Sequence, residues 1–353
     1  MSTAAERPTD ERLLVVDLAA TSKNWALTAE GEDRLLRETP PGWRVHIVRA
    51  PTSSDGDGPP RPSDEVMQAI RSAEVYFGFG IPRPLFLEAR RLKWVHSAAA
   101  GVGSVLYAEM VNSDVLFTNS AGIHAIPIAE YVVAGVLHFL RGLDFAVDQQ
   151  RRTEWNKTPF VRLDSVLREM DTVRALIIGV GGLGGATAQR LSALGARCTG
   201  VRRRVELGAP PGFERVIGLD QLDDELPSHD VVVLAAPLTD ETKGLMTAER
   251  LRLLPPSTII VNVARGALID DEALVERLTS GRLRGAVLDV FREEPLPPTS
   301  PLWQVRQILL TPHVSPVSPG RFWPRQLDLF IDNWSRYTSG QALRNAVDKR
   351  AGY

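Results

Sequence analysis

The chain has 353 residues, enough for two domains of ordinary size, each with its own core. Its 41 basic and 43 acidic residues nearly cancel, which excludes the strongly basic surface of a nucleic-acid-binding protein. Residues 1–12 carry charges of both signs and no apolar stretch, and no apolar run reaches the ~18 residues of a membrane span. We therefore expect a soluble, cytoplasmic protein without nucleic-acid or membrane partners.

The apolar segments are short, rich in Val, Ile and Leu, and separated by helical patterns, which is typical of parallel sheets covered by helices on both faces. The first group of predicted strands comprises residues 13–16, 45–48, 75–78, 94–96 and 115–118. The second group comprises residues 176–179, 198–201, 231–234, 259–262, 286–289 and 308–311. The two groups predict two doubly wound α/β domains. The single cysteine, Cys198, lies in a strand and is expected to be a buried, inert thiol.

A long helix with apolar periodicity is predicted for residues 126–140, between the two groups of strands. Pro127 suits its first turn, because proline has no N–H to leave unpaired there. Another helix is predicted from about residue 321 to 337, before a turn-rich tail. This C-terminal segment is too short to form a domain, so we expect it to pack against a domain formed by earlier residues.

The strand at 176–179 runs into a Gly-x-Gly-x-x-Gly motif that is followed by a helical segment. Residues assigned to the cofactor turn are Gly179, Gly181, Gly182, Leu183 and Gly184. Gly179 permits the tight turn, Gly181 lets the backbone approach a pyrophosphate, and Gly184 lets the helix pack closely on the strand. The strand and helix around the motif favour a dinucleotide site over an ordinary glycine-rich turn.

An acidic residue about 20 positions after these glycines would bind the ribose hydroxyls of NAD. Three arginines, Arg202, Arg203 and Arg204, stand at about that distance instead. Guanidinium groups bind a 2′-phosphate through charge-assisted hydrogen bonds, whereas a carboxylate would repel it. The sequence therefore favours NADP over NAD as cofactor. The alternative is a solvated basic loop.

Three polar residues of complementary type follow three strands of the second group: Arg265, Glu294 and His313. Because the carboxyl ends of parallel strands share one edge of a sheet, we expect these residues to converge there with the glycine turn. Reduction of a 2-oxo acid needs a cation for the carboxylate and carbonyl, and an acid for the developing alkoxide. Arg265 suits the first role and His313 the second, with Glu294 orienting the imidazole. No metal ion is expected.

Each of these residues alone has a simpler explanation, as a surface arginine, a solvated loop acid or a strand-end histidine. Their joint placement favours the catalytic interpretation. Among the other histidines, His96 and His124 lie near the predicted crevice and are weaker candidates for substrate contact. His46 and His138 sit in apolar runs and are expected to pack in the core, and His229 precedes a strand in a polar stretch.

Several segments around these residues match the sequence pattern of a known family. They are residues 234–239, 262–266, 288–296, 311–313 and 333–348. With them the sequence resembles the D-isomer-specific 2-hydroxyacid dehydrogenases, which include phosphoglycerate dehydrogenases and glyoxylate/hydroxypyruvate reductases. The resemblance runs from about residue 91 to the end. It implies a Rossmann nucleotide domain, residues 124–314, inserted into a flavodoxin-like substrate domain made of residues 1–123 and 315–353.

The resemblance also implies roles for individual residues, with Arg265, Glu294 and His313 as the catalytic set. Asp289 would bind the nicotinamide carboxamide. The cofactor pocket would include Ala236, Pro237, Thr242, Val263 and Ala264. Backbone N–H groups of a loop would bind the substrate carboxylate, and this loop comprises Ala99, Ala100, Gly101 and Val102. The helix from Ile126 would form a homodimer, the alternative being a plain core helix.

The sequence departs from the family pattern at Arg202, in agreement with NADP use, and at Gly103. It also departs in residues 314–317, where Pro316 constrains the backbone, and residues 321–323 are candidates to face the site. These departures concern the substrate rather than the reaction. We expect an oxidoreductase that reduces glyoxylate, hydroxypyruvate or a bulkier 2-oxo acid. The alternatives are a nucleotide-sensing, corepressor-like binding protein and a phosphite or formate dehydrogenase.

Overall fold

The computed structural model describes residues 11–20, 25–52, 61–162 and 165–352. The predicted charged N-terminal segment, residues 1–12, therefore lies almost entirely outside the described residues. The chain divides into two compact units. We call residues 1–123 with 318–353 the discontinuous domain, and residues 124–317 the inserted domain.

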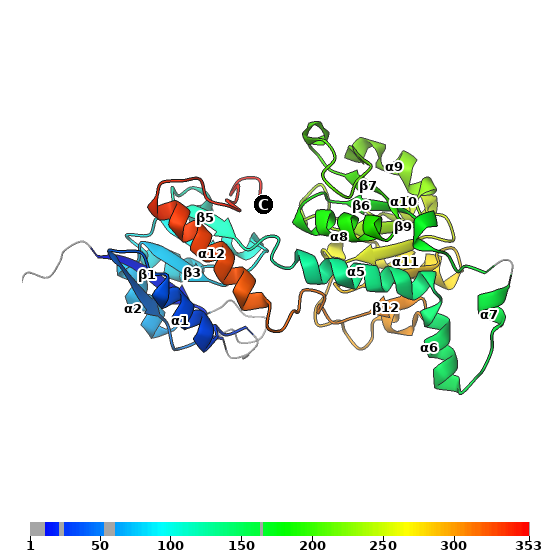
Figure 1. Cartoon of the computed structure of the whole chain (residues 1–353), viewed down its shortest axis with the longest axis horizontal. Coiled ribbons are helices and arrows are strands. Elements are labelled where there is room, and N and C mark those ends of the chain that lie inside the picture. The colour runs from blue at the N-terminus through cyan, green and yellow to red at the C-terminus, as the bar shows by residue number, and fades with distance from the viewer. Residues whose placement is uncertain (1–10, 21–24, 53–60, 163–164, 353) are drawn as a thin grey trace, which may run out of the picture. The chain divides into compact units, whose positions relative to one another are not determined.

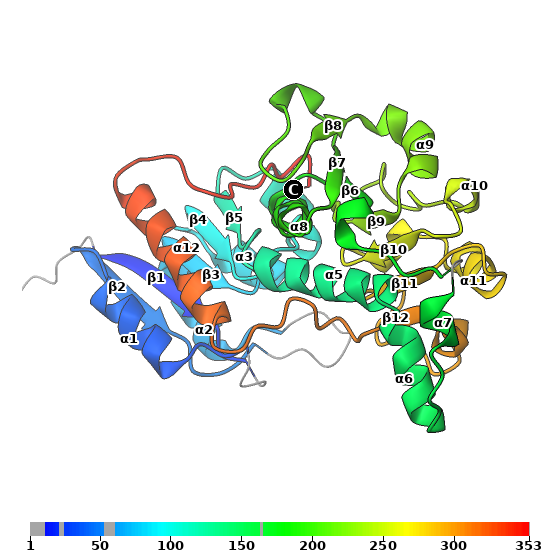
Figure 2. The same ribbon diagram turned by 45° about the vertical axis from the view of Figure 1, so that its right-hand side comes forward.

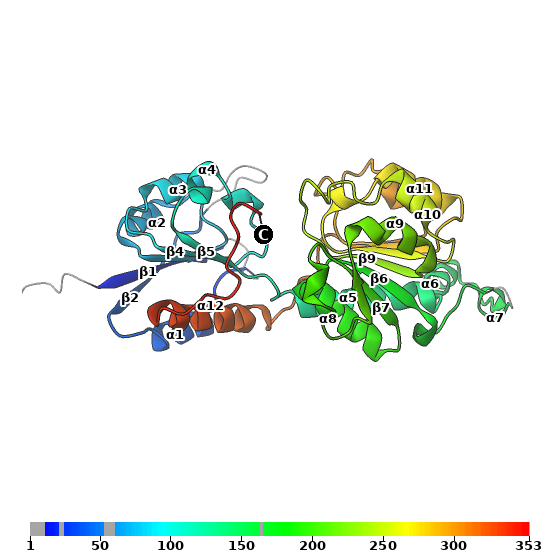
Figure 3. The ribbon, with the colours of Figure 1, turned by 90° about the horizontal axis from the view of Figure 1, so that it is seen from above.

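The discontinuous domain contains a five-stranded parallel sheet with the strand order β2-β1-β3-β4-β5. Its strands are β1 (Arg12–Asp17), β2 (Trp43–Ile47), β3 (Val75–Gly78), β4 (Trp94–Ser97) and β5 (Leu116–Asn119). One face is covered by α1 (Ala29–Arg37) and α12 (Phe322–Thr338). The other is covered by α2 (Asp64–Ala69), α3 (Arg83–Glu88) and α4 (Ala108–Val111) (Figure 3). The C-terminal helix α12 thus completes a domain begun by the first residues of the chain.

The inserted domain contains a seven-stranded parallel sheet with the order β12-β11-β10-β9-β6-β7-β8. Its strands are β6 (Arg174–Ile178), β7 (Arg197–Val201), β8 (Arg215–Ile217), β9 (Val231–Leu234), β10 (Ile259–Asn262), β11 (Gly285–Leu288) and β12 (Ile308–Leu310). Strands β7 and β8 follow β6 on one side of it, and the next strand along the chain, β9, pairs with the other side of β6. The gap between the ends of β6 and β9 is therefore the point where the strand order reverses, which is where ligands bind in such sheets.

Helices cover both faces of this second sheet as well. On one face α5 (Ala125–Leu140) and α8 (Gly182–Ala193) lie side by side (Figures 1 and 2). On the other lie α9 (Leu222–Glu225), α10 (Ala248–Leu253) and α11 (Asp271–Thr279), while α6 (Leu143–Arg152) and α7 (Thr158–Val161) follow α5. In the described part of the chain no single helix is long and apolar enough to cross a membrane, and α5 with α6 meets that test only as a pair bent by 68°.

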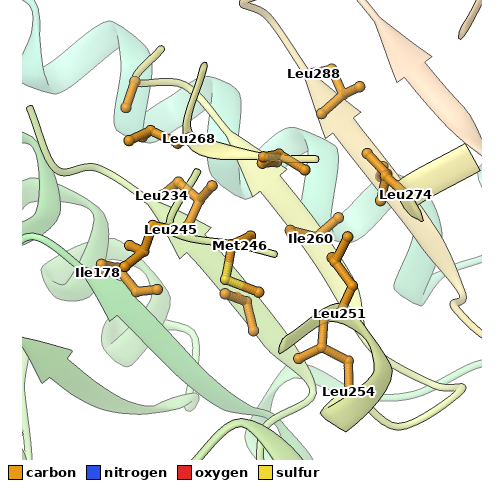
Figure 4. Packing of buried hydrophobic residues seen from close by; sticks show 14 of the residues in the cluster. Ile178, Leu234, Leu245, Met246, Leu251, Leu254, Ile260, Leu268, Leu274 and Leu288 are labelled. Atoms are coloured by element: carbon orange, nitrogen blue, oxygen red, sulfur yellow. The ribbon is translucent and has the colours of Figure 1, made fainter. Parts of the chain in front are cut away.

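Branched aliphatic side chains form the core between the second sheet and helices α9 to α11. Ile178, Leu234, Ile260 and Leu288 contribute from four neighbouring strands and meet leucines of α10 and α11 (Figure 4). Each fully buried side chain of this size stabilises the fold by roughly 1.5–3 kcal/mol relative to exposure. This core holds the strand ends in fixed register.

The predicted fold class, two doubly wound parallel-sheet domains, is confirmed. Strand β8 was not predicted, because only two of its three residues, Val216 and Ile217, are apolar. Cys198 lies in β7 with 1% exposure, and burial raises the pKa of its thiol to about 12. The prediction of an inert buried thiol agrees with this setting.

Candidate active site

The glycine motif forms the turn from β6 into α8, beside the end of β9. Gly179 has φ +106°, and a Cβ there would lie 2.7 Å from the backbone of Ala235. A Cβ on Gly184 would lie 1.8 Å from the carbonyl oxygen of Gly179. Both positions therefore require glycine for the fold itself.

Gly181 differs from these two glycines in its surroundings. A Cβ at this position would meet no atom of the described residues within 4 Å, and its φ of −81° is ordinary. The fold alone therefore does not require glycine at position 181. The open space lies at the N-terminus of α8, where backbone N–H groups and the helix dipole favour a phosphate. The turn thus fits a dinucleotide pyrophosphate.

The three arginines follow β7, the strand next to β6 in the sheet. Arg202 is half-buried, and its guanidinium donates to the carbonyl oxygen of Gly208 at 3.4 Å. Arg203 donates to Glu241 at 2.6 Å, and both side chains of this pair are more than half exposed. Arg204 is exposed. Because an exposed ion pair is worth at most about 1 kcal/mol, a phosphate can displace Glu241 at little cost.

The imidazole of His313 and the carboxylate of Glu294 are brought together at the ends of the neighbouring strands β11 and β12. Nδ1 of His313 lies 2.7 Å from Oε2 of Glu294. The other carboxylate oxygen, Oε1, accepts the N–H of Phe291 at 2.8 Å, which fixes the carboxylate. Nε2 of His313 is thereby left as the nitrogen that can exchange a proton with a ligand.

Asp289 holds the turn that carries His313. This residue is fully buried, and its Oδ1 accepts from the Thr311 hydroxyl at 2.5 Å and from the N–H of Val314 at 2.9 Å. Its Oδ2 accepts from the N–H of Ser315 at 2.9 Å. His313 itself has φ +52°, a left-handed conformation that a residue with a side chain adopts only when its surroundings impose it.

Tyr131 extends this network from helix α5. Its hydroxyl lies 2.7 Å from Oγ1 of Thr311, and burial raises its pKa to about 12, so it stays protonated and can act as a donor. Tyr131 could not be found from the sequence, because a tyrosine within an apolar-periodic helix is typical of a core position. Its partner becomes visible only in the folded chain.

Arg265 follows β10 and is exposed. Its Nη1 donates to the carbonyl oxygen of Ala264 at 2.7 Å, and the side-chain amide of Asn262 donates to the carbonyl oxygen of Arg265 at 2.9 Å. A Cβ on the next residue, Gly266, would lie 1.9 Å from the backbone of Phe291. The loop of Arg265 therefore packs directly against the segment that leads to Glu294.

A cavity of about 490 Å³ adjoins the His313–Glu294 pair within the inserted domain. Apart from these two residues its lining is apolar, formed by Phe291, Pro295, Leu296, Trp303, Leu310 and Pro312. An apolar wall beside this pair lowers the local dielectric and strengthens the hydrogen bond between the two side chains.

The remaining residues assigned to the cofactor pocket follow β9 and β10. Thr242 donates its hydroxyl to the carbonyl oxygen of Pro237 at 2.7 Å and accepts the N–H of Thr239 at 2.8 Å, which closes the loop after β9. Three others are nearly buried and offer mainly backbone to a ligand: Ala236, Val263 and Ala264.

The loop of residues 99–102 lies in the discontinuous domain, directly after β4. Its carbonyl groups are held by this domain, since Asn119 donates to Ala100 at 2.7 Å and the N–H of Ser120 to Ala99 at 3.2 Å. No hydrogen bond among the described residues uses the N–H of Ala100, Gly101 or Val102. These donors can therefore bind an anion.

The competing histidines have other partners. His96 has no exposed surface, its Nδ1 contacts Oγ1 of Thr118 at 2.7 Å, and burial lowers its pKa to about 3. His229 is also buried, and His124 lies 3.3 Å from the carbonyl oxygen of Pro316. A neutral, buried His96 is a packing residue of the first sheet.

Comparison with known proteins agrees with this geometry. The family model "D-isomer specific 2-hydroxyacid dehydrogenase, NAD binding domain" matches residues 133–315. A glyoxylate/hydroxypyruvate reductase A from Salmonella paratyphi B is 32% identical over 275 residues, which cover 76% of this chain and 84% of the relative.

Two solved structures are similar over nearly the whole chain. A D-isomer specific 2-hydroxyacid dehydrogenase from Xanthobacter autotrophicus, in complex with NADPH and MES, has a TM-score of 0.76 and 29% identity, covering 98% of this chain and 100% of that one. An NADPH-dependent glyoxylate/hydroxypyruvate reductase from Sinorhizobium meliloti, in complex with NADP and sulfate, has a TM-score of 0.74 and 27% identity, with coverages of 97% and 100%.

The chain therefore belongs to the D-isomer specific 2-hydroxyacid dehydrogenase family. It is an NAD(P)-dependent oxidoreductase of small 2-oxo and 2-hydroxy acids. The family predicted from the sequence is confirmed.

Proposed function

We propose that the protein uses NADPH to reduce a small 2-oxo acid to the corresponding D-2-hydroxy acid, as a reductase of the glyoxylate/hydroxypyruvate type. The observation that carries this proposal is the 2.7 Å contact between His313 and Glu294 at the ligand-binding edge of the second sheet. The relatives named as glyoxylate/hydroxypyruvate reductases support the substrate class.

In this proposal each residue has one task. NADPH, when bound, would supply the hydride that the carbonyl carbon accepts. Arg265 binds the substrate carboxylate and polarises the carbonyl, since its guanidinium is planar and always charged. Protonated His313 donates from Nε2 to the oxygen as charge develops on it, and Glu294 stabilises the imidazolium. In the oxidative direction neutral His313 accepts the hydroxyl proton.

The loop of residues 99–102 is assigned to the substrate carboxylate as well, because the N–H groups of Ala100, Gly101 and Val102 have no acceptor among the described residues, whereas that of Ala99 donates to Ser97. We assign the 2′-phosphate of NADP to Arg202, Arg203 and Arg204, of which Arg203 is held by Glu241 in an exposed pair. Complexes of the two similar structures with NADPH or NADP support this preference. Asp289 is assigned to the nicotinamide carboxamide, because its Oδ2 accepts one hydrogen bond, from Ser315, and can accept another.

We further propose a homodimer built around α5 and the helices that follow it. Helix α6 has no buried residue, and Leu143 and Val147 on it are 49% and 39% exposed. Trp155 after it is 89% exposed. Apolar side chains gathered on one extension are typical of an association surface. Light scattering coupled to gel filtration tests this point.

The proposed function is tested by steady-state oxidation of NADPH and NADH with a panel of 2-oxo acids that includes glyoxylate and hydroxypyruvate. We expect turnover with at least one 2-oxo acid and a higher kcat/KM for NADPH than for NADH. Turnover with none of them would overturn the proposal, and faster turnover with NADH at equal concentration would overturn the cofactor preference.

A further inference from the structure

Four aromatic rings of the discontinuous domain form a cluster that the reaction described above does not use. We call it the aromatic cluster, and its members are Trp25, Phe79, Phe322 and Trp323. Trp25 contacts Phe322 and Phe79 edge to face, with ring centroids 5.1 and 6.4 Å apart. Phe79 also meets Trp323 at 6.3 Å, and Phe322 meets Trp323 at 5.0 Å. Three segments far apart in the sequence thus supply one continuous aromatic surface.

This cluster lies at the carboxyl edge of the first sheet. Phe79 directly follows β3, and Trp25 lies in the connection after β1, the neighbour of β3. In an open parallel sheet this is the edge that binds ligands.

The loop of residues 99–102 stands beside the aromatic cluster. It follows β4, which pairs with β3 in a register that sets Gly78 opposite Ser97. The N–H of Ala98 donates to the carbonyl oxygen of Gly78 at 2.7 Å. Gly78 directly precedes Phe79, and Ala98 directly precedes Ala99. Phe79 and the loop therefore leave neighbouring strands at the same edge of the sheet, and a ligand whose carboxylate is bound by the loop lies at that edge.

Burial differs strongly within the cluster. Trp323 and Phe322 are 6% and 8% exposed and anchor the start of α12, whereas Trp25 and Phe79 are 37% and 42% exposed. Exposed aromatic rings cost free energy in water, and the buried pair below fixes their position. The indole N–H of Trp323 has no acceptor among the described residues, so packing rather than a polar network holds this ring. The result is a buried aromatic pair that carries two partly exposed rings.

We infer that the aromatic cluster binds the substrate's side chain, and that the preferred substrate is a 2-oxo acid with an aromatic or branched apolar substituent. This inference rests on the proposed function, because it takes the carboxylate of the substrate to be bound by residues 99–102. Glyoxylate has only a hydrogen in place of a side chain and hydroxypyruvate a short polar one. Neither can cover the rings of Trp25 and Phe79, whereas a phenyl or isobutyl group can.

The test compares kcat/KM with NADPH for phenylpyruvate, 4-methyl-2-oxopentanoate, hydroxypyruvate and glyoxylate. We expect phenylpyruvate to exceed glyoxylate by at least about 10-fold, because even one buried methylene is worth roughly 10-fold or more in such a pocket. Phe79→Ala and Trp25→Ala are expected to lower kcat/KM for phenylpyruvate by about 10- to 100-fold and that for glyoxylate by less than about 3-fold. Phe79→Leu, which keeps an apolar side chain, should retain more of the phenylpyruvate activity than Phe79→Ala.

Leu36→Ala is the matched control. Leu36 is 52% exposed in the last turn of α1, at the opposite edge of the same sheet, because a crossover helix runs antiparallel to the strands. Its loss should leave both substrates unchanged. Turnover of glyoxylate without a preference for phenylpyruvate, or equal losses for both substrates in Phe79→Ala, would overturn the inference and leave the proposed function intact. Turnover of no 2-oxo acid would overturn the proposed function, and the inference with it.

Discussion

His313 and Glu294 meet at 2.7 Å across two turns that follow neighbouring strands of the second sheet. Neither side chain is held by this contact alone. Glu294 is fixed by the N–H of Phe291, and the backbone N–H of His313 donates to the carbonyl oxygen of Asp289 at 2.9 Å. The pair is therefore pre-oriented by the protein before any ligand binds, which is what a general acid requires.

Glu294→Gln should lower kcat by about 10- to 100-fold, a part of the usual worth of general acid catalysis, because the imidazolium loses its carboxylate partner. The amide oxygen can still accept the N–H of Phe291, so the loop should remain in place. Affinity for NADPH, measured by fluorescence titration, should not change. Glu293→Gln is the matched control, since Glu293 is exposed beside it, and an equal loss in both variants would contradict the role of Glu294.

Asp289→Asn should destabilise the inserted domain by about 1–3 kcal/mol, because an amide nitrogen would face a backbone N–H donor at a buried site. The turn that carries His313 should also loosen, and kcat should fall. Thr311→Val, which removes the hydroxyl between Tyr131 and Asp289 but leaves the two backbone donors, should have the same effects to a smaller extent. Thermal melts and kcat check both variants, and wild-type values for Asp289→Asn would contradict a positioning role.

The strands, the glycine turn and the positions of Arg265, Glu294 and His313 after strands of the second sheet could be predicted from the sequence, because a parallel sheet brings its strand ends to one edge whatever the loops do. The positive φ of His313 could not, because it depends on how Asp289 holds the following turn, and the link from Tyr131 could not, because it joins segments separated by most of the inserted domain. Strand β8 could not be predicted either, because it contains only two apolar residues. Of the aromatic cluster, the sequence indicated only Phe322 and Trp323 as candidates to face the site. Trp25 and Phe79 could not be assigned to it, because they meet these rings only in the folded chain.

The glycine turn offers three variants with different expected outcomes. Gly181→Ala should fold like the wild type but bind NADPH about 10-fold or more weakly, because only a ligand occupies the space its Cβ would enter. Gly184→Ala should lower thermal stability, since its Cβ would overlap the carbonyl oxygen of Gly179. Gly185→Ala, with open space around it in the helix, is the control for both measurements. Normal NADPH affinity in Gly181→Ala would argue against a pyrophosphate at this turn.

Stability at acid pH should depend on His96. Burial lowers its pKa to about 3 in the fold, whereas an unfolded histidine titrates near 6.5. Between these two pH values the unfolded state therefore binds a proton that the folded state does not. The contribution of neutral His96 to the free energy of unfolding is complete above about pH 6.5 and is lost as the pH falls toward 3. The loss is at most about 1.4 kcal/mol per pH unit. His96→Gln should show a smaller drop in urea midpoint between pH 7 and pH 5 than the wild type, and an equal or larger drop would contradict this assignment.

The most direct test of the account is the rate of NADPH oxidation by the best 2-oxo acid in wild type and His313→Ala, with NADPH affinity measured on the same samples. The variant should lose about 10²- to 10⁴-fold in kcat while binding NADPH as the wild type does. Unchanged turnover in His313→Ala would remove this histidine from the reaction and contradict the proposed chemistry.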